Sequence, residues 1–302
     1  MTQPRSLDSA RMNGRLMDRF LVSLRKMRGL PLVPVLILAA AAGPLQAQDA
    51  VRLRLDSTAG ESLTYKFELN LDIAVPPELG GNQRLESLMV LQQTTQGVRG
   101  DTLYFDSAVE DASFSLRSAE GAEMLPDASA NLVGQNFRTA FTRRAEPVII
   151  EIEGQSPQST AQIRSALRQG GFPTLPERAV RVGDRWKDTV RIRAAEMGMA
   201  APGFLILIND ISLQRLSRSG SSTIADILVE TAYDFEPDRD AFPGVSVEMT
   251  GSRADNVRFD VTRGHFLSAR GAQDFTMSLT VPGLGQAFAV RGNGESSAGL
   301  VN

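Results

Sequence analysis

The chain contains no cysteine and only one histidine, His265, among its 302 residues. The absence of cysteine excludes disulfide bonds, thiolate metal ligands, a cysteine nucleophile and the lipidated cysteine of a bacterial lipoprotein. A metal site built from several imidazoles is excluded as well, so we expect no metal ion and no cofactor. We expect His265 itself to lie at the surface, because it follows Gly264 at the tip of a predicted hairpin.

Lysine is scarce after the first 47 residues, since the rest of the chain contains only Lys66 and Lys187. Without Met1–Ala47, the 32 basic and 35 acidic residues of the chain become 25 and 33, which gives a net charge of −8. An acidic surface repels phosphate groups, so nucleic acid and anionic lipid headgroups are poor candidate partners. An apolar small molecule or another envelope protein remains as the expected partner.

A short apolar run near the N-terminus predicts a signal peptide. Basic residues at 25, 26 and 28 precede an uncharged run over residues 30–42, and small residues follow up to Ala47. The run is 13 residues long, whereas a membrane-spanning helix needs ~20, so a permanent transmembrane helix or a buried helix is the weaker interpretation. We predict that residues 1–47 are an upstream extension plus signal peptide, with Met27 as the preferred start. Cleavage near Ala47 would leave residues 48–302 as a periplasmic or secreted protein.

The region after the predicted cleavage site is dominated by alternating apolar and polar residues. Over residues 63–75 every odd position is apolar and nearly every even position is polar, which predicts a long strand with one buried face. Similar strands are expected at 85–96, 102–109, 113–116, 257–262 and 275–281. Residues 204–208 are apolar throughout, which predicts a strand covered on both faces at the centre of the sheet.

Two segments have helical patterns. Residues 129–143 follow a possible cap at Asp127 and carry apolar residues at positions 133, 137, 140 and 141. Residues 157–170 follow the cap Ser156 and end at two glycines. We expect both helices to lie against the sheet.

The two halves of residues 48–302 have a similar order of features. Residues 50–155 and 172–302 each open a strand, pass through a loop, form two strands around a glycine at 100 or 220, and close at a glycine at 154 or 264. This order indicates an internal duplication, although short strands with glycine turns also resemble one another by chance. We predict one mainly β domain, with a large curved antiparallel sheet or incomplete barrel and one or two short helices.

One stretch resembles a known signature. Leu175-Pro176, followed by the sequence Val-Arg-Val-Gly-Asp-Arg-Trp over residues 180–186, resembles the Leu-Pro…Val-x-Val-Gly-Asp-x-Trp motif of secreted bacterial proteins of unknown function. The sequence Phe-Asp-Val-Thr-Arg-Gly over residues 259–264 is similar to their closing hairpin. The resemblance implies an antiparallel β fold, and the strand pattern is similar to the lipoprotein-carrier folds of the LolA and LolB type. It brings no catalytic residues with it.

Motifs for catalysis and metal binding are weak. The Gly-Gln-Ser sequence at 154–156 lacks the second glycine of a nucleophile elbow, so Ser156 is interpreted as a helix cap. Glu236, Asp238 and Asp240 could hold calcium, but the loop lacks the glycine and distal glutamate of a recognised calcium site, which favours a solvated turn. Trp186 is expected to start a strand facing the core, with ligand stacking as the alternative.

These observations favour a non-enzymatic envelope protein that binds an apolar ligand, lipid or lipoprotein-like, or a protein partner. The alternative is a carboxylate-based hydrolase of glycosidase type. The candidate binding residues are Met197 and Met199, because the loop over residues 194–203 has one charge where loops are usually polar. Exposed methionines adapt to varied apolar partners, whereas the alternative is that both side chains fold back and fill gaps in the core.

Overall fold

The computed structural model describes residues 50–77, 81–118, 121–124, 132–152, 172–194, 203–238, 246–280 and 287–301. Gln48–Asn302 form one compact unit. None of the helices in these ranges has the length and apolar character that crossing a membrane requires.

The described residues form twelve strands of one sheet, and all the strand pairings are antiparallel. The strands are β1 (Ser62–Ala74), β2 (Gln83–Arg99), β3 (Thr102–Ser118), β4 (Gly121–Met124), β5 (Asn136–Thr142), β6 (Pro147–Ile152), β7 (Arg185–Arg193), β8 (Gly203–Ser219), β9 (Ser222–Pro237), β10 (Ser246–Asp260), β11 (His265–Thr280) and β12 (Ala287–Leu300).

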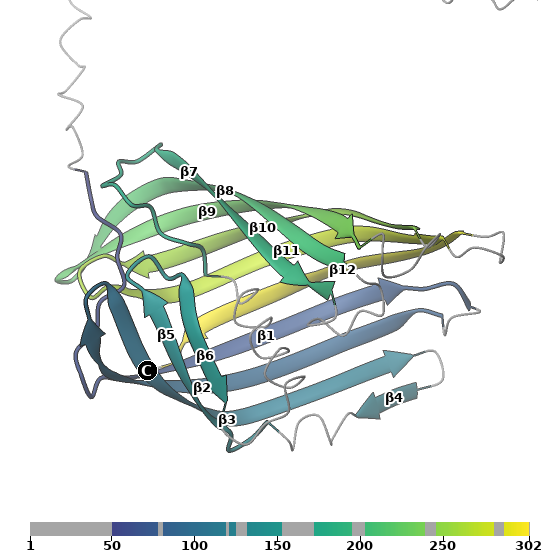
Figure 1. The fold of residues 1–302 in the computed structure, drawn as a ribbon, viewed down its shortest axis with the longest axis horizontal. Helices are drawn as coiled ribbons and strands as arrows, with labels where there is room; N and C mark the ends of the chain where they lie inside the picture. The colour runs from purple at the N-terminus through teal and green to yellow at the C-terminus, as the bar shows by residue number, and fades with distance from the viewer. Residues whose placement is uncertain are drawn as a thin grey trace, which may run out of the picture. The chain divides into compact units, whose positions relative to one another are not determined.

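The spatial order of the main sheet is β6-β5-β3-β2-β1-β12-β11-β10-β9-β8-β7, with β4 paired to β3 (Figure 1). The chain runs outward from β1 to one edge at β6, starts again at the other edge with β7, and returns to the middle. There β12 pairs with β1 over ten residues, so the first and last strands lie side by side. The sheet is open, since β6 and β7 end the order without pairing to each other among the described residues.

The predicted fold class is confirmed, because the protein is mainly β and built on one antiparallel sheet. Strand β1 matches the prediction over residues 63–75, and its odd-numbered side chains from Leu63 to Ile73 share one face, as the alternation indicated. Strands β2 and β3 include the strands predicted at 85–96, 102–109 and 113–116. Strand β10 contains residues 257–260 of the strand predicted at 257–262, whose last two residues form a turn, and β11 contains residues 275–280 of the strand predicted at 275–281. The halves 50–155 and 172–302 coincide with strands β1–β6 and β7–β12, and their origin by duplication stays a prediction.

The predicted helix at residues 129–143 is wrong over its second half, which forms strand β5 and pairs with β3. Its apolar residues Val133, Phe137 and Phe141 are four positions apart. This spacing places side chains on one face of a strand as well as of a helix, so the pattern did not distinguish the two. The other predicted helix, residues 157–170, lies outside the described residues.

The expectation for residues 204–208 is also wrong. They belong to β8, which is next to the edge strand β7 and not central. Leu205 and Leu207 are buried, but Ile208 on the opposite face is 43% exposed. The apolar run is therefore covered on one face only, and the exposed face carries apolar side chains that the core does not require.

The sheet bends around a cavity without closing into a barrel. Side chains from all eleven strands of the main sheet line this one cavity. Eleven strands spaced ~4.8 Å apart would span about 50 Å if flat, too far for their side chains to border a common space. The concave face of the sheet is therefore the inner face of the protein.

Two segments outside the strands cross one end of this cavity. The segment 51–57 pairs with Val180, and the Leu55 amide donates to the Arg143 carbonyl at 2.8 Å. The amide of Asp56 donates to the Gly264 carbonyl at 2.8 Å, and this approach leaves no room for a Cβ at Gly264. The segment 172–180 is held beside the segment 51–57, because the Leu175 amide donates to the Arg144 carbonyl at 2.8 Å and the Val180 amide donates to the Val51 carbonyl at 2.8 Å. We call these two segments the end plug.

Candidate ligand-binding cavity

The cavity enclosed by the sheet has a volume of about 1200 Å³. Pockets for small molecules usually measure ~300–1000 Å³, so this space is large for a small-molecule site. Its lining is mostly aliphatic and aromatic. The inner face of β1–β3 contributes Leu63, Tyr65, Phe67, Leu69, Leu71, Ile73, Leu85, Met89, Leu91, Leu103, Phe105 and Phe114.

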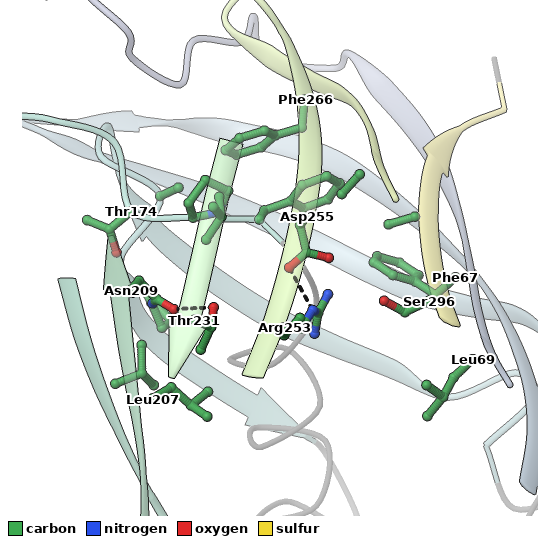
Figure 2. A pocket seen from close by; sticks show the side chains of 18 of the residues that line it. Phe67, Leu69, Thr174, Leu207, Asn209, Thr231, Arg253, Asp255, Phe266 and Ser296 are labelled. Atoms are coloured by element: carbon green, nitrogen blue, oxygen red, sulfur yellow. Dashed lines mark hydrogen bonds and ion pairs between the residues drawn. The ribbon is translucent and has the colours of Figure 1, made fainter. Parts of the chain in front are cut away.

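Aromatic rings form the wall of the cavity beside the end plug. Phe172 of the plug stacks on Phe266 of β11, with ring centroids 4.4 Å apart and planes 11° apart. Tyr65 and Phe67 of β1 contact the same Phe172 ring edge-on, at 5.6 and 6.3 Å. Phe172 therefore ties the plug to both halves of the sheet. Figure 2 shows Phe67 and Phe266 on the cavity wall.

A row of polar side chains crosses the mainly apolar inner face. Strand register pairs Asp188 with Asn209, Asn209 with Thr231, Thr231 with Arg253, and Arg253 with Gln273. These residues come from five neighbouring strands, β7 to β11, and all of them line the cavity. We call them the polar row.

Apolar side chains flank the polar row and also continue it. On one side lie Val190, Leu207 and Phe275, each of which is two residues away from the member of the polar row on the same strand. Beyond β11 the same line of paired residues passes through Gly294 to Leu71 and Leu85. The polar row is thus confined to the β7–β11 part of the sheet.

Hydrogen bonds within the polar row fix the orientation of its amides. The Thr231 hydroxyl donates to Asn209 Oδ1 at 2.7 Å, and both side chains are more than nine-tenths buried (Figure 2). The Tyr233 hydroxyl donates to Gln273 Oε1 at 3.0 Å. Burial raises the pKa of Tyr233 to about 12, so the hydroxyl keeps its proton at neutral pH. The amide oxygens of Asn209 and Gln273 therefore accept hydrogen bonds from other side chains of the protein. The NH₂ groups of the same two residues are the donors that they can offer to a ligand.

An ion pair lies beside the row. Arg253 Nε is 2.6 Å from Asp255 Oδ2, and both side chains project from β10 into the cavity (Figure 2). Asp255 is 3% exposed, and its other carboxylate oxygen lies against Gly271 of β11, where a Cβ would not fit. At the outer end of the row, the Thr174 hydroxyl donates to Asp188 Oδ2 at 2.8 Å.

His265 corrects a prediction. It is 4% exposed and lines the cavity, where a surface position was expected. It begins β11 immediately after the tight turn that Asp260 stabilises, and the end plug covers that turn through Asp56. Burial lowers the pKa of His265 below its ordinary value, although the carboxylates of Asp260 and Glu61 oppose the shift. Its imidazole is therefore neutral at neutral pH.

Trp186 lies where the sequence predicted it, in β7 with its ring packed against the main core cluster. Its Nε1 donates to the Thr174 carbonyl at 2.8 Å. The preceding turn is held by Asp184, which accepts a hydrogen bond from the Arg181 amide at 3.1 Å. The Gly-Asp-x-Trp sequence thus has a structural role in anchoring β7 to the end plug.

The predicted binding residues Met197 and Met199 lie outside the described residues. The methionines that line the cavity are Met89, Met249 and Met277. In the acidic turn, Glu236 forms an ion pair with Arg191 at 2.8 Å, and Asp240 lies outside the described residues. Within the described ranges, no cluster of three or more residues suited to holding a metal ion is present.

The sequence analysis missed the polar row. A signal for it exists in three of the five strands, where one polar residue lies between two apolar residues of the same face: Asp188 lies between Trp186 and Val190, Asn209 between Leu207 and Ile211, and Thr231 between Val229 and Tyr233. A single polar residue on the buried face of one strand is unremarkable by itself. Only the register of the strands shows that five such positions align.

Comparison of the chain with protein-family models and with curated proteins finds no match. The resemblance of residues 172–186 and 259–264 to secreted bacterial proteins therefore stays a prediction.

Proposed function

We propose that this protein binds an apolar, chain-bearing ligand such as a lipid in the cavity of its sheet and does not convert it chemically. The observation that carries the proposal is the cavity of about 1200 Å³ with its mainly aliphatic and aromatic lining. Binding hydrocarbon in such a space is favourable by ~25 cal/mol for each Å² of apolar surface removed from water. The adaptable side chains of Met89, Met249 and Met277 in the wall support a ligand of variable shape.

The proposed place of action is the periplasm or the extracellular medium. The support is the sequence of residues 1–47, with its basic cluster, 13-residue apolar run and small residues near Ala47. A carrier or receptor for lipid in the cell envelope is consistent with this leader. N-terminal sequencing of the protein recovered from its native envelope tests this part, and a chain that still begins before residue 30 would overturn it.

The alternative function, a glycosidase-type hydrolase, requires two carboxyl groups ~5–9.5 Å apart across the scissile bond. Asp188 and Asp255 both line the cavity, but they lie on strands β7 and β10, three strand spacings or about 14 Å apart along the sheet. Each is also engaged, Asp188 by Thr174 and Asp255 by Arg253. This pair therefore lacks the spacing along the sheet that the hydrolase requires.

The direct test is mass spectrometry of the protein purified from its native envelope under conditions that preserve complexes. We expect a co-purifying lipid. In parallel, the purified protein should bind N-phenyl-1-naphthylamine, an uncharged probe that fluoresces in apolar surroundings. A protein with neither a co-purifying lipid nor probe binding would refute the proposal.

A pair of neighbouring residues on β1 provides a test of whether the probe binds in the cavity. Leu69 points into the cavity (Figure 2), whereas Asn70 is exposed on the opposite face of the same strand. Leu69→Trp fills part of the cavity and should weaken probe binding by at least about tenfold, equivalent to ~1.4 kcal/mol. Asn70→Trp adds the same ring outside and should leave probe binding unchanged. Equal effects of the two variants would place the probe elsewhere.

A further inference from the structure

We infer that the polar row selects the headgroup of the ligand, and that the preferred ligand is an amphiphile whose polar group is uncharged and rich in acceptor oxygens, such as the ester and hydroxyl groups of a monoacylglycerol. This inference rests on the proposed function, because it names the chemical class of ligand that the same cavity takes. The juxtaposition that carries it is the alignment of Asp188, Asn209, Thr231, Arg253 and Gln273 across five strands inside an apolar cavity.

A polar row on the inner face is costly unless it is used. Burying a polar group without a hydrogen-bonding partner costs about 1–3 kcal/mol in proteins, and an apolar side chain of similar size would avoid the cost. Asn209 and Thr231 are more than nine-tenths buried, and the hydrogen bond between them uses the Thr231 proton and Asn209 Oδ1, so the Asn209 NH₂ group is the donor that this pair can offer to a ligand. A ligand whose polar group lies on the row supplies the partners that an apolar ligand cannot.

The hydrogen bonds to the two amide oxygens of the row indicate that the ligand presents hydrogen-bond acceptors. Thr231 uses Asn209 Oδ1, and Tyr233 uses Gln273 Oε1, so both amides turn their NH₂ groups to serve another acceptor. Carbonyl, ester and hydroxyl oxygens accept such hydrogen bonds.

The charges around the row decide that the acceptor group is uncharged. Two carboxylates, Asp188 and Asp255, lie on or beside the row. Asp255 neutralises the Arg253 guanidinium at 2.6 Å, and the other guanidinium of the lining, that of Arg191, is paired with Glu236 at 2.8 Å. A carboxylate or phosphate on the ligand would add a further negative charge in a space where water screens it poorly. Uncharged oxygens avoid this repulsion.

The sheet also indicates where the hydrocarbon chain lies. The line of paired residues that carries the row across β7–β11 becomes Leu71 and Leu85 on β1 and β2. The inner face there is completed by Leu91, Leu103 and Phe114. A ligand with its polar group on the row thus lays its chain across the inner face of β1–β3.

The experiment measures displacement of N-phenyl-1-naphthylamine from the purified full protein by two compounds with the same oleoyl chain, monooleoylglycerol and oleate. At about pH 8 a carboxyl group is ionised, since its ordinary pKa is ~4–5. We expect monooleoylglycerol to displace the probe at a concentration at least about tenfold lower than oleate, a difference of ~1.4 kcal/mol. Oleate binding as tightly as, or more tightly than, monooleoylglycerol would overturn the inference.

Variants assign the preference to the row. The double variant Asn209→Leu/Thr231→Val removes two polar groups together and should weaken monooleoylglycerol binding several-fold, with probe affinity retained. The preference over oleate should fall but not vanish, because Asp188 and Asp255 still oppose the oleate charge. Ser87→Val removes a polar group from the cavity lining on β2, outside the row, and should keep the full preference. A double variant that keeps the wild-type preference would contradict the assignment.

The variant Asp188→Asn tests the charge argument, because it removes the negative charge and keeps the size of the side chain. The amide oxygen of the asparagine can still accept the hydrogen bond from the Thr174 hydroxyl. This variant should strengthen oleate binding several-fold and leave monooleoylglycerol binding unchanged. Asp106→Asn, on the exposed face of β3, is the matched control and should change neither. If the wild-type protein has neither a co-purifying lipid nor probe binding, the proposed function fails; if it binds the probe but Asp188→Asn leaves oleate binding unaffected, only the headgroup inference fails.

Discussion

The ring of Phe172 lies parallel to the ring of Phe266, with centroids 4.4 Å apart, although 94 residues separate the two in the chain. Phe172 belongs to the connection that leads from the β6 edge of the sheet to the β7 edge, and Phe266 belongs to β11 near the middle. The stack therefore holds the connection against the concave face of the sheet. The open sheet keeps its bend at this end because the plug bridges strands that do not pair with one another.

Phe172→Ala should destabilise the protein by about 2–4 kcal/mol, because it removes three aromatic contacts and leaves a void beside Leu175 and Phe266. In a domain of this size, 1 kcal/mol corresponds to a fall of ~2–4 °C in Tm. Urea unfolding followed by the fluorescence of Trp186, the single tryptophan of the chain, measures the change. Val98→Ala, at an exposed site on β2, should change the unfolding free energy by less than about 0.5 kcal/mol. Similar losses in the two variants would show that the plug is not anchored through Phe172.

Gly271→Ala should displace the carboxylate of Asp255, because the added Cβ would occupy the place of Asp255 Oδ1. Disturbing a buried ion pair costs several kcal/mol when one partner loses its position, so we expect a loss of about 2 kcal/mol or more. Gly299→Ala on the neighbouring strand β12 is a matched control, since a Cβ there meets no atom within 4 Å. Its effect on Tm should be within the equivalent of about 0.5 kcal/mol. If alanine is tolerated equally at both sites, the carboxylate is not confined by Gly271.

His265 should make the protein less stable in mildly acidic solution. Burial lowers its pKa in the folded state, while the unfolded chain has the ordinary value of 6.5. Between these two pKa values the unfolded state binds more protons, so the stabilisation is complete above pH 6.5 and is lost as the pH falls through the folded-state pKa. His265 is the only histidine, and ordinary carboxyl groups titrate at ~4–4.5, so this window belongs to His265.

The variant His265→Leu isolates this effect because leucine does not titrate. We expect Tm of the wild-type protein to fall between about pH 7.5 and pH 5.5, and the fall to be clearly smaller in the variant. Thermal melts in a series of buffers at constant ionic strength measure the slope. Parallel slopes for the two proteins would mean that His265 is not protonated on unfolding in this range.

Asp260→Ala should destabilise the turn between β10 and β11 by about 1–3 kcal/mol. Asp260 Oδ1 accepts the amides of Thr262 and Arg263, both at 2.9 Å. Burial opposes ionisation of Asp260, but these hydrogen bonds together with Ser222 and the neighbouring His265 outweigh it and lower the pKa. The contribution is therefore present above the ordinary pKa of 3.8 and lost as the pH falls below it.

The control for Asp260→Ala is Asp106→Ala, which removes an exposed carboxylate that contacts Arg138 at 3.6 Å. Exposed ion pairs contribute about 0–1 kcal/mol, so the control should unfold at nearly the wild-type urea concentration. Asp260→Asn keeps one oxygen for the two amides and should fall between Asp260→Ala and the wild type. If Asp106→Ala were as unstable as Asp260→Ala, the hydrogen bonds of Asp260 in this turn would not be the cause of the lost stability.

Much of the fold could be predicted because strand alternation is a local property. The odd residues of β1, from Leu63 to Ile73, all line the cavity as their period of two indicated. The same local reasoning failed at Phe137 and Phe141, because a spacing of four residues fits a helix face and a strand face equally. It failed at residues 204–208 because composition does not report how many strands flank a given strand.

The sequence by itself therefore determined the fold class of the protein, most of its long strands and, for β1, the side that faces inward. The tertiary structure alone decided which strands are neighbours and in what register they pair. The burial of His265 by the end plug and the alignment of Asp188, Asn209, Thr231, Arg253 and Gln273 depend on contacts between residues far apart in the chain. A shift of one residue in a single pairing would turn one of these side chains to the outer face, and no local pattern in the sequence records that register.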